Sequence, residues 1–253
     1  MLPWARAPAT SYDPAVRTAF LALRLGGAAA IVVAIVGQLT NVISYFDDNP
    51  LRDESATIVN FFSYFTIDSN ILAVVVLLIG AWRLARRLDD SPAYALLRAG
   101  AVTYMAITGT VYNLLLRNVE LVEGLGQAWS NEIVHVVGPV VMVVDWLFAP
   151  GRRRLEWRHV GVLLAFPVVW TAYTMIRGPH VDDPVLGADS WYPYPFLNPD
   201  EFATGYGEVA FFLVLIGVAF AAVSLLVVWV SRRNRPPSAP VSAPSGSATV
   251  SRR

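Results

Sequence analysis

The sequence predicts an all-α, polytopic membrane protein built as a bundle of six transmembrane helices. The chain of 253 residues is 55% hydrophobic and only 15% charged, with a mean hydropathy of +0.50, and a soluble domain of this length is far less apolar. Six windows reach the roughly 20 apolar residues that a helix needs to cross about 30 Å of hydrocarbon. These runs are continuous and rich in Leu, Val and Ala, whereas strands of a membrane β-barrel are shorter and alternate polar with apolar residues.

The expected spans follow one another in one domain. They cover residues 24–46, 58–82, 96–116, 130–149, 160–177 and 206–231. We expect a cytoplasmic N-terminal segment at residues 1–16, the transmembrane domain at 17–231, and a cytoplasmic tail at 232–253. The tail is rich in Pro, Ser, Ala and Gly and cannot bury enough apolar surface to offset the entropy of ordering, so it is predicted to be disordered.

Arginine placement orients the helices, because cytoplasmic loops hold the excess of positive charge. The arginines near span ends on one side are Arg6, Arg17, Arg83, Arg86, Arg87, Arg152, Arg153, Arg154, Arg158, Arg232, Arg233 and Arg235. The alternate loops carry mostly Asp and Glu. Both termini are therefore expected in the cytoplasm, and the protein is expected to be a multi-pass component of the cell (plasma) membrane.

Composition excludes several classes of function. Nineteen basic residues balance nineteen acidic ones, so the chain has no basic surface for nucleic acid. Every basic residue is an arginine, which excludes lysine Schiff-base chemistry, and the absence of cysteine excludes disulfides and thiolate catalysis. No Walker loop, Rossmann glycine pattern or soluble-hydrolase serine motif occurs. We expect no cofactor and no metal.

Polar residues gather in the outer half of every expected span, while the inner halves are mostly aliphatic with Asp145 as the main exception. Because polar groups are expensive inside a bilayer, this distribution indicates function. It predicts a cavity that opens toward the outer leaflet.

Within that cavity, Ser63, Thr66, Ser69 and Asn70 form one stripe of a helix, with Thr66 in its middle. Asp68 lies about 200° away from Thr66 around the same helix, so the two are not expected to pair. Thr66 should lie about 12 Å and His135 about 8 Å below the outer ends of their helices, at 1.5 Å per residue. The two residues are therefore expected at the same depth.

A histidine that contacts Thr66 would act as the general base that a weak hydroxyl nucleophile requires. Glu132 or Asn131 would orient the imidazole ring, and Asn70, Asn113 or Asn131 would stabilise the oxyanion. Pro139 removes the helical partner of the His135 carbonyl, so a kink is expected there.

Three motifs resemble a known family. They are YFTIDSN at residues 64–70, His135 followed four residues later by Pro139, and WYPYPFL at residues 191–197. Their combination resembles the androgen-induced, FAR-type family of integral membrane proteins and its bacterial six-helix branch. The animal members are threonine hydrolases of fatty acid esters of hydroxy fatty acids. The resemblance implies that Thr66 is the nucleophile and His135 its partner, and that the WYPYPFL segment is a lid or an interfacial anchor.

The sequence thus predicts a lipid-ester hydrolase with a fatty-acyl ester substrate and with Thr66 and His135 as catalytic residues. It does not determine the oligomeric state. The alternative is a small transporter or lipid-binding protein in which Asp68, Glu132, His135 and Glu208 act as proton-linked ligands. Zinc held by His135, His180 and a carboxylate is a further alternative.

Overall fold

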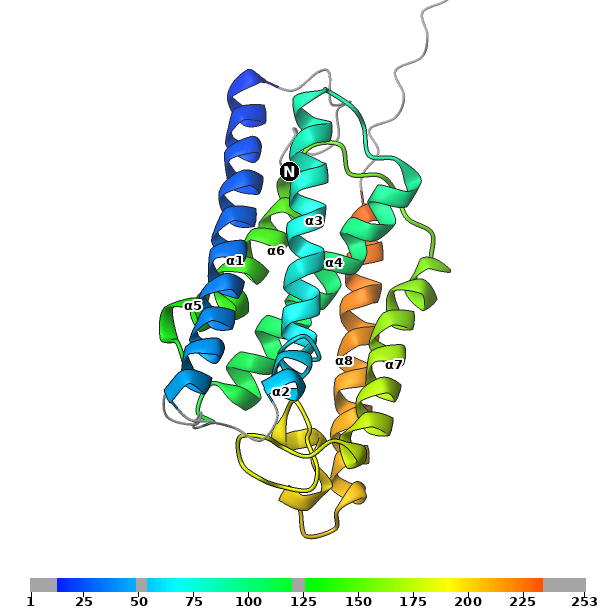
Figure 1. Cartoon of the computed structure of the whole chain (residues 1–253). Coiled ribbons are helices and arrows are strands. Elements are labelled where there is room, and N and C mark those ends of the chain that lie inside the picture. Colours follow the sequence, from blue (N-terminus) through cyan, green and yellow to red (C-terminus); the bar gives the residue numbers. More distant parts are fainter. Residues whose placement is uncertain (1–12, 49–53, 120–125, 234–253) are drawn as a thin grey trace, which may run out of the picture.

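The described part of the chain is a bundle of helices (Figure 1). The structure is a computed structural model, and it describes residues 13–48, 54–119 and 126–233. Six helices are long and apolar enough to cross a membrane, and within the described ranges no β-strand occurs. The expected all-helical architecture, with six helices of sufficient length and hydropathy to span a membrane, is therefore confirmed. The expected tail after residue 233 lies outside the described residues.

The observed helix bounds are close to the expected ones at most span ends. The helices that correspond to the first, third, fifth and sixth spans are α1 (Pro14–Asp48), α4 (Pro92–Val111), α7 (His159–Arg177) and α8 (Tyr206–Arg232). The main difference is at the start of α1, which begins ten residues before the first apolar window.

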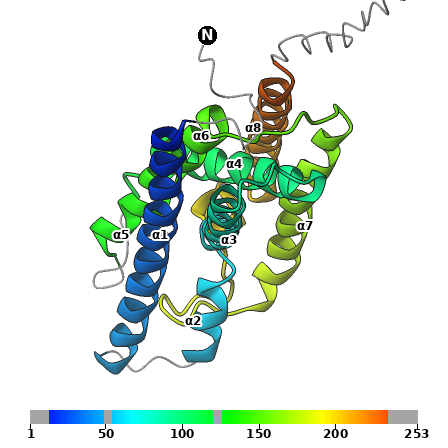
Figure 2. The ribbon, with the colours of Figure 1, turned by 90° about the horizontal axis from the view of Figure 1, so that it is seen from above.

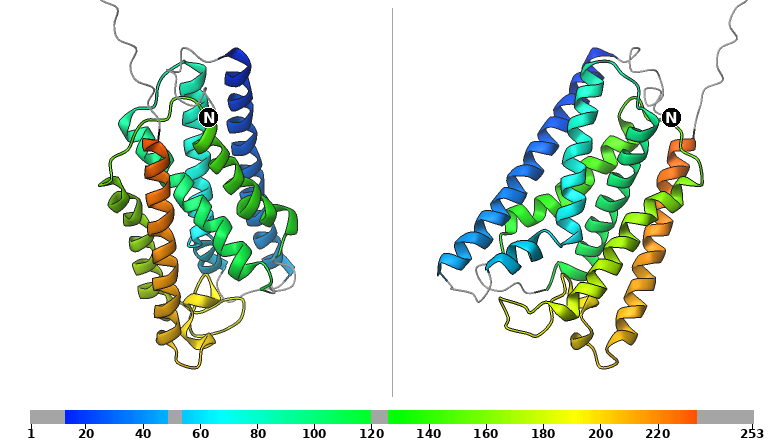
Figure 3. Two further views of the ribbon diagram at one scale, coloured as in Figure 1. Left: turned by 180° about the vertical axis from the view of Figure 1, so that it is seen from behind. Right: turned by 45° about the vertical axis from the view of Figure 1, so that its right-hand side comes forward.

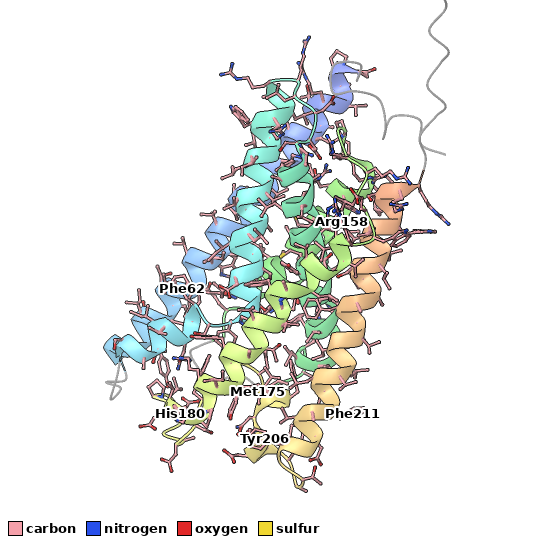
Figure 4. All side chains as sticks on the ribbon, turned by 90° about the vertical axis from the view of Figure 1, so that its right-hand side faces the viewer. Phe62, Arg158, Met175, His180, Tyr206 and Phe211 are labelled. Carbon is pink, nitrogen blue, oxygen red and sulfur yellow. The ribbon has the colours of Figure 1, made fainter. Side chains whose placement is uncertain are left out.

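The second expected span is broken, which corrects the prediction of one helix over residues 58–82. A short helix, α2 (Glu54–Phe61), is followed by a turn, and the chain then starts α3 (Phe65–Ala85). Phe62, in this turn, lies between the end of the bundle that carries Arg158 and the end that carries His180 and Tyr206 (Figure 4). The hydropathy pattern conceals the break because its residues, FFSYF, are mostly apolar and include no Pro or Gly.

Two π-helical turns interrupt the third and fourth spans. The turn η3 (Tyr112–Leu116) extends α4, and the turn η4 (Ile133–Val137) lies between α5 (Ala128–Glu132) and α6 (Gly138–Phe148). The second turn immediately precedes Pro139, where an irregularity was expected. Such π-turns widen a helix locally and often occur at functional sites.

Helices α3 and α4 form the centre of the bundle (Figure 2). In each, 56% of the most apolar window is buried inside the protein, against 22–33% for the other four spans. One apolar core lies where α1, α3, α4 and α6 meet, and a second joins the start of α3 to α4, α7 and α8. The α7–α8 pair closes this second side (Figure 3). Exposed side chains such as Val168 and Val214 are suited to contact lipid.

A buried charge network occupies the end of the bundle at which α3 ends, which corrects the expectation that Asp145 is the main polar residue there. Arg24 of α1 donates through Nε to Asp145 of α6 at 2.6 Å, and Arg98 of α4 donates to the same carboxylate at 2.8 Å. Arg98 also pairs with Asp90 at 2.9 Å, and Arg24 donates to the Gly80 carbonyl of α3 at 2.6 Å. The network ties four helices together.

We expect Asp145→Asn to destabilise the protein strongly. Asp145 is 1% exposed, and removal of one member of a buried ion pair typically costs about 3–5 kcal/mol because the remaining charges stay buried. The free energy of unfolding, measured in detergent by denaturant titration, tests this. The matched control is Glu156→Gln, which removes the exposed pair with Arg158 and should change that free energy by at most about 1 kcal/mol. Equal small effects of the two changes would contradict the structural importance of the network.

The ends of the bundle separate the two classes of loop. The start of α1 and the end of α8 lie at the same end of the bundle, together with the loops that follow α3 and α6 (Figure 1). The opposite end carries α2 and the loop from His180 to Tyr206 (Figures 1 and 4). This arrangement agrees with the expected grouping of arginine-rich loops on one side.

Single-cysteine labelling tests the orientation cleanly, because the chain has no cysteine of its own. Ala188→Cys lies on an exposed stretch of the loop at the α2 end, and Glu156→Cys on an exposed stretch at the other end. A membrane-impermeant maleimide added to intact cells should label Ala188→Cys and should label Glu156→Cys only after permeabilisation. The reverse pattern would place the termini outside the cytoplasm.

Candidate functional site

Thr66 lies at the start of α3, directly after the break. It is the second residue of the helix rather than the middle of a long helical stripe, as the sequence had suggested. Ser63 belongs to the turn, where its hydroxyl contacts the Val59 carbonyl and the Tyr173 hydroxyl. Thr66 is 7% exposed. The break therefore presents a buried hydroxyl next to backbone N–H groups that have no partner within the helix.

The structure brings Thr66 and His135 into contact. Thr66 Oγ1 lies 3.2 Å from His135 Nε2, which is hydrogen-bonding distance for a hydroxyl and a general base. The contact joins the N-terminus of α3 to the π-turn η4 and agrees with the similar depths expected for the two residues. That the pair is catalytic stays a prediction.

The partners of His135 determine which of its nitrogens carries the proton. His135 Nδ1 lies 3.0 Å from the main-chain oxygen of Asn131. A carbonyl oxygen only accepts, so in the neutral ring Nδ1 holds the proton and Nε2 is free to accept one. Nε2 is the atom that faces Thr66, so this tautomer is the one that a base requires.

The imidazole plane is fixed by an aromatic partner. The ring of Tyr112 in η3 stacks on His135 with 4.1 Å between centroids and 17° between planes. Asn131 Nδ2 donates to the Tyr112 hydroxyl at 3.0 Å. Asn131 thus orients the ring twice, once by its main chain and once through Tyr112. Glu132, the other expected orienting residue, instead pairs with Arg117 at 3.0 Å, and its side chain is 46% exposed.

Tyr194 is the third side chain at the Thr66 hydroxyl. Its own hydroxyl lies 3.1 Å from Thr66 Oγ1 and accepts a hydrogen bond from Thr66 N–H at 3.1 Å. The tyrosine comes from the WYPYPFL segment, which lies at the end of the bundle that carries α2 (Figure 1). Its ring stacks on Phe196 with 5.2 Å between centroids and meets Tyr64 edge to face. Burial raises the pKa of Tyr194 to about 12, so the phenol keeps its proton at neutral pH.

Asn70 joins the segment that carries Thr66 to the segment that carries His135. It is fully buried, and its Nδ2 donates to the Thr66 carbonyl at 2.8 Å and to the Val134 carbonyl at 3.1 Å. Ser69 supports the same turn through the Thr66 carbonyl and the Thr108 hydroxyl. Asn70 therefore positions Thr66 against η4, but both of its donor hydrogens are already used.

The remaining expected site residues lie elsewhere or have other partners. Asn113 is exposed, donates to the Gly109 carbonyl and accepts from Arg117. As expected, no hydrogen bond joins Asp68 to Thr66 in the described structure. Glu208 accepts hydrogen bonds from Thr204. The carboxylates proposed as proton-linked ligands thus do not converge on one site.

An apolar cavity adjoins the Thr66–His135 contact. Its empty volume is about 540 Å³, part of which opens to the surroundings. Thr66, His135 and Tyr194 form part of its wall. The apolar part of the lining includes Phe65, Ile107, Trp170, Phe196, Leu213 and Phe220. The wall beside the threonine hydroxyl is therefore largely apolar, which suits an apolar ligand group.

Metal ligation by this site has no geometric support. Across the ranges that the structure describes, no group of three His, Cys, Asp or Glu side chains is placed to hold a metal ion. His180 is exposed in the turn η5 (Gly178–His180) after α7. The zinc alternative would need His180 to join His135, and the structure does not bring these two together.

Sequence reasoning missed the individual roles of Tyr194, Tyr112 and Trp170. Trp170 Nε1 donates to the Ser63 carbonyl at 3.1 Å and so satisfies the backbone at the break. Tyr194 was within reach of prediction, because it belongs to a motif already expected to be either a lid over the cavity or an interfacial anchor. No sequence pattern pairs Tyr112 with His135, because the contact depends on two π-turns that face each other.

A comparison of the chain with known protein families, with curated proteins and with solved structures finds no match.

Proposed function

We propose that the protein is a membrane-embedded lipid-ester hydrolase in which Thr66 is the nucleophile and His135 its general base. The observation that carries this proposal is the chain of contacts from Thr66 Oγ1 to His135 Nε2 and from His135 Nδ1 to the Asn131 carbonyl, at the wall of an apolar cavity. It combines a nucleophile, a base in the required tautomer and an orienting group. The resemblance to the FAR-type family supports the same assignment.

The proposed reaction proceeds in two halves. Thr66 Oγ1 attacks the ester carbonyl carbon while its proton moves to His135 Nε2, and the carbonyl π electrons move onto the carbonyl oxygen. When the tetrahedral intermediate collapses, the ester C–O bond breaks and His135 returns the proton to the leaving alcohol. Water, deprotonated by His135, then attacks the acyl-threonine, and Thr66 regains its proton as the fatty acid leaves.

The substrate class follows from the surroundings of the pair. The cavity beside Thr66 is lined largely by aliphatic and aromatic side chains and suits a fatty-acyl chain. A site beside the WYPYPFL segment would receive such an ester from the outer leaflet if the termini are cytoplasmic. We therefore propose a fatty-acyl ester, such as a branched fatty acid ester of a hydroxy fatty acid, as substrate and the cell membrane as location.

The transporter alternative receives no specific support from this geometry. It requires a route through the half of the bundle beyond the site, and that half holds the Arg24–Asp145–Arg98 network. It also assigns the main role to carboxylates, two of which are engaged by Arg117 and Thr204. Mutation distinguishes the two functions, because hydrolysis should depend most on Thr66 and His135 and transport most on the carboxylates.

We expect Thr66→Ala and His135→Ala each to abolish turnover, because each removes a group that forms or breaks a bond. The assay is release of fatty acid from a fatty-acyl ester by purified protein in detergent, combined with labelling of Thr66 by a fluorophosphonate. Loss of rate should exceed about 10³-fold, as for other catalytic nucleophiles and their bases.

Matched controls are Thr110→Ala and His180→Ala. Thr110 lies on α4, where its hydroxyl contacts only the Ala106 carbonyl of the same helix, and His180 is exposed. Both variants should retain wild-type turnover. Wild-type protein that neither releases fatty acid nor takes up the label, or a Thr66→Ala variant as active as wild type, would overturn the hydrolase proposal.

A second prediction concerns the acyl chain. Ile216 of α8 lines the cavity, so Ile216→Trp should fill part of it and reduce kcat/KM for long-chain esters at least tenfold relative to short-chain esters. Loss or gain of even one methylene group in an apolar pocket changes discrimination by roughly 10- to 200-fold. The matched control is Val218→Trp on the exposed side of the same helix, where Val218 is 61% exposed. Equal chain-length profiles for both variants would show that the acyl chain binds elsewhere.

A further inference from the structure

We propose that the hydroxyl of Tyr194 and the backbone N–H of Thr66 together form the oxyanion site of this enzyme. The inference rests on the proposed hydrolase function and adds a catalytic residue to it. Thr66 N–H and Tyr194 Oη are 3.1 Å apart, and the same phenol oxygen lies 3.1 Å from the nucleophile Oγ1. Two donors thus meet beside the atom that attacks.

Counting protons along the contacts shows which partner of Tyr194 receives its hydrogen. His135 Nδ1–H donates to the Asn131 carbonyl, so Nε2 accepts, and Thr66 Oγ1 must donate its single proton to Nε2. The proton in the contact between Tyr194 and Thr66 Oγ1 therefore belongs to the phenol. Tyr194 donates to Oγ1 and, through its oxygen, accepts from Thr66 N–H.

This arrangement suits the change of charge during attack. The carbonyl oxygen becomes negative as Oγ1 bonds to the carbonyl carbon, and it then lies only two bonds away from Oγ1. The phenol O–H can rotate about its C–O bond from Oγ1 to that oxygen. The Thr66 N–H can donate to the same oxygen in place of the phenol oxygen that it contacts in the resting site.

The other amide donors near the site are occupied. Asn70 Nδ2 donates to two carbonyls, Asn131 Nδ2 donates to Tyr112, and Asn113 Nδ2 donates to Gly109. The three asparagines expected to stabilise the oxyanion therefore have other partners. The Thr66 N–H also has a partner, but that partner is the Tyr194 hydroxyl, which is the other member of the proposed oxyanion site.

The phenol is also held in place before the reaction. Its ring stacks on Phe196 and packs edge to face on Tyr64, and Tyr64 in turn packs edge to face on Trp191. Donors that are fixed in advance stabilise a developing charge without reorganisation, which is why oxyanion donors contribute strongly to catalysis.

The test is Tyr194→Phe, which keeps the ring and its packing and removes only the hydroxyl. We expect kcat for a fatty-acyl ester to fall about 10²- to 10³-fold, as when one oxyanion donor is removed from another hydrolase, with KM changed less than about threefold. Affinity for a trifluoromethyl ketone, which forms a tetrahedral adduct with the nucleophile, should fall by a factor similar to that of kcat/KM. Affinity for a non-reactive ether analogue of the substrate should stay unchanged.

The matched control is Tyr192→Phe in the same loop, because the Tyr192 hydroxyl contacts Tyr206 rather than Thr66. This variant should behave like wild type. Tyr194→Phe removes the acceptor of the Thr66 N–H, so its unfolding temperature should fall modestly, and all variants are assayed at a temperature at which each remains folded. If Tyr194→Phe matches wild type, or if it weakens the ether analogue as much as the trifluoromethyl ketone, the oxyanion role is overturned while the Thr66–His135 mechanism stands. If wild-type protein is itself inert, both proposals fall together.

Discussion

The site depends on a break in a helix that an apolar environment would otherwise keep continuous. Inside a bilayer every backbone polar group needs a partner within the protein, because lipid offers none. At the break, Trp170 Nε1 donates to the Ser63 carbonyl, Tyr194 accepts from Thr66 N–H, and Asn70 donates to the Thr66 carbonyl. The side chains that satisfy this backbone also surround the Thr66 hydroxyl. The contacts that stabilise the break therefore also determine the geometry of the site.

The charge network and the candidate site lie toward opposite ends of α3. The contacts of Arg24 and Arg98 with Asp145 join α1, α4 and α6. The contact of Arg24 with the Gly80 carbonyl joins α3 to the same network. A Cβ at Gly80 would collide with the Tyr94 hydroxyl and crowd the Arg24 guanidinium, so the close approach needs glycine. Thr66 stands at the far end of α3, and His135 just before α6. Thr66 and His135 thus lie on or next to helices that the charge network joins. Helices α7 and α8 and the WYPYPFL loop complete the cavity.

Much of the architecture could be predicted from sequence, because hydropathy shows directly which apolar runs are long enough to cross a membrane. It located six spans. The cost of polar groups in lipid, together with the resemblance to the FAR-type family, indicated Thr66 and His135. The break at Phe62 was not predictable, since an apolar turn without Pro or Gly has the same hydropathy as a helix. The pairing of Arg24 and Arg98 with Asp145 was not predicted, because it requires knowledge of which helices are neighbours. The stack of Tyr112 on His135 depends on π-turns, which have no simple periodicity.

The choice of groups at the site is consistent with its low-dielectric surroundings. A carboxylate behind the imidazole would introduce a charge whose desolvation is expensive. Here a main-chain carbonyl orients the ring, so the resting chain from Tyr194 to Asn131 is neutral, and the Glu132–Arg117 pair stays partly exposed. During attack an imidazolium and an oxyanion would form on either side of Thr66, and each would be the other's closest counter-charge. Hydrogen-bond donors to the oxyanion would then matter more than in an enzyme whose histidine has a carboxylate partner. The phenol of Tyr194 would supply such a donor where a main-chain carbonyl, and not a carboxylate, orients the histidine.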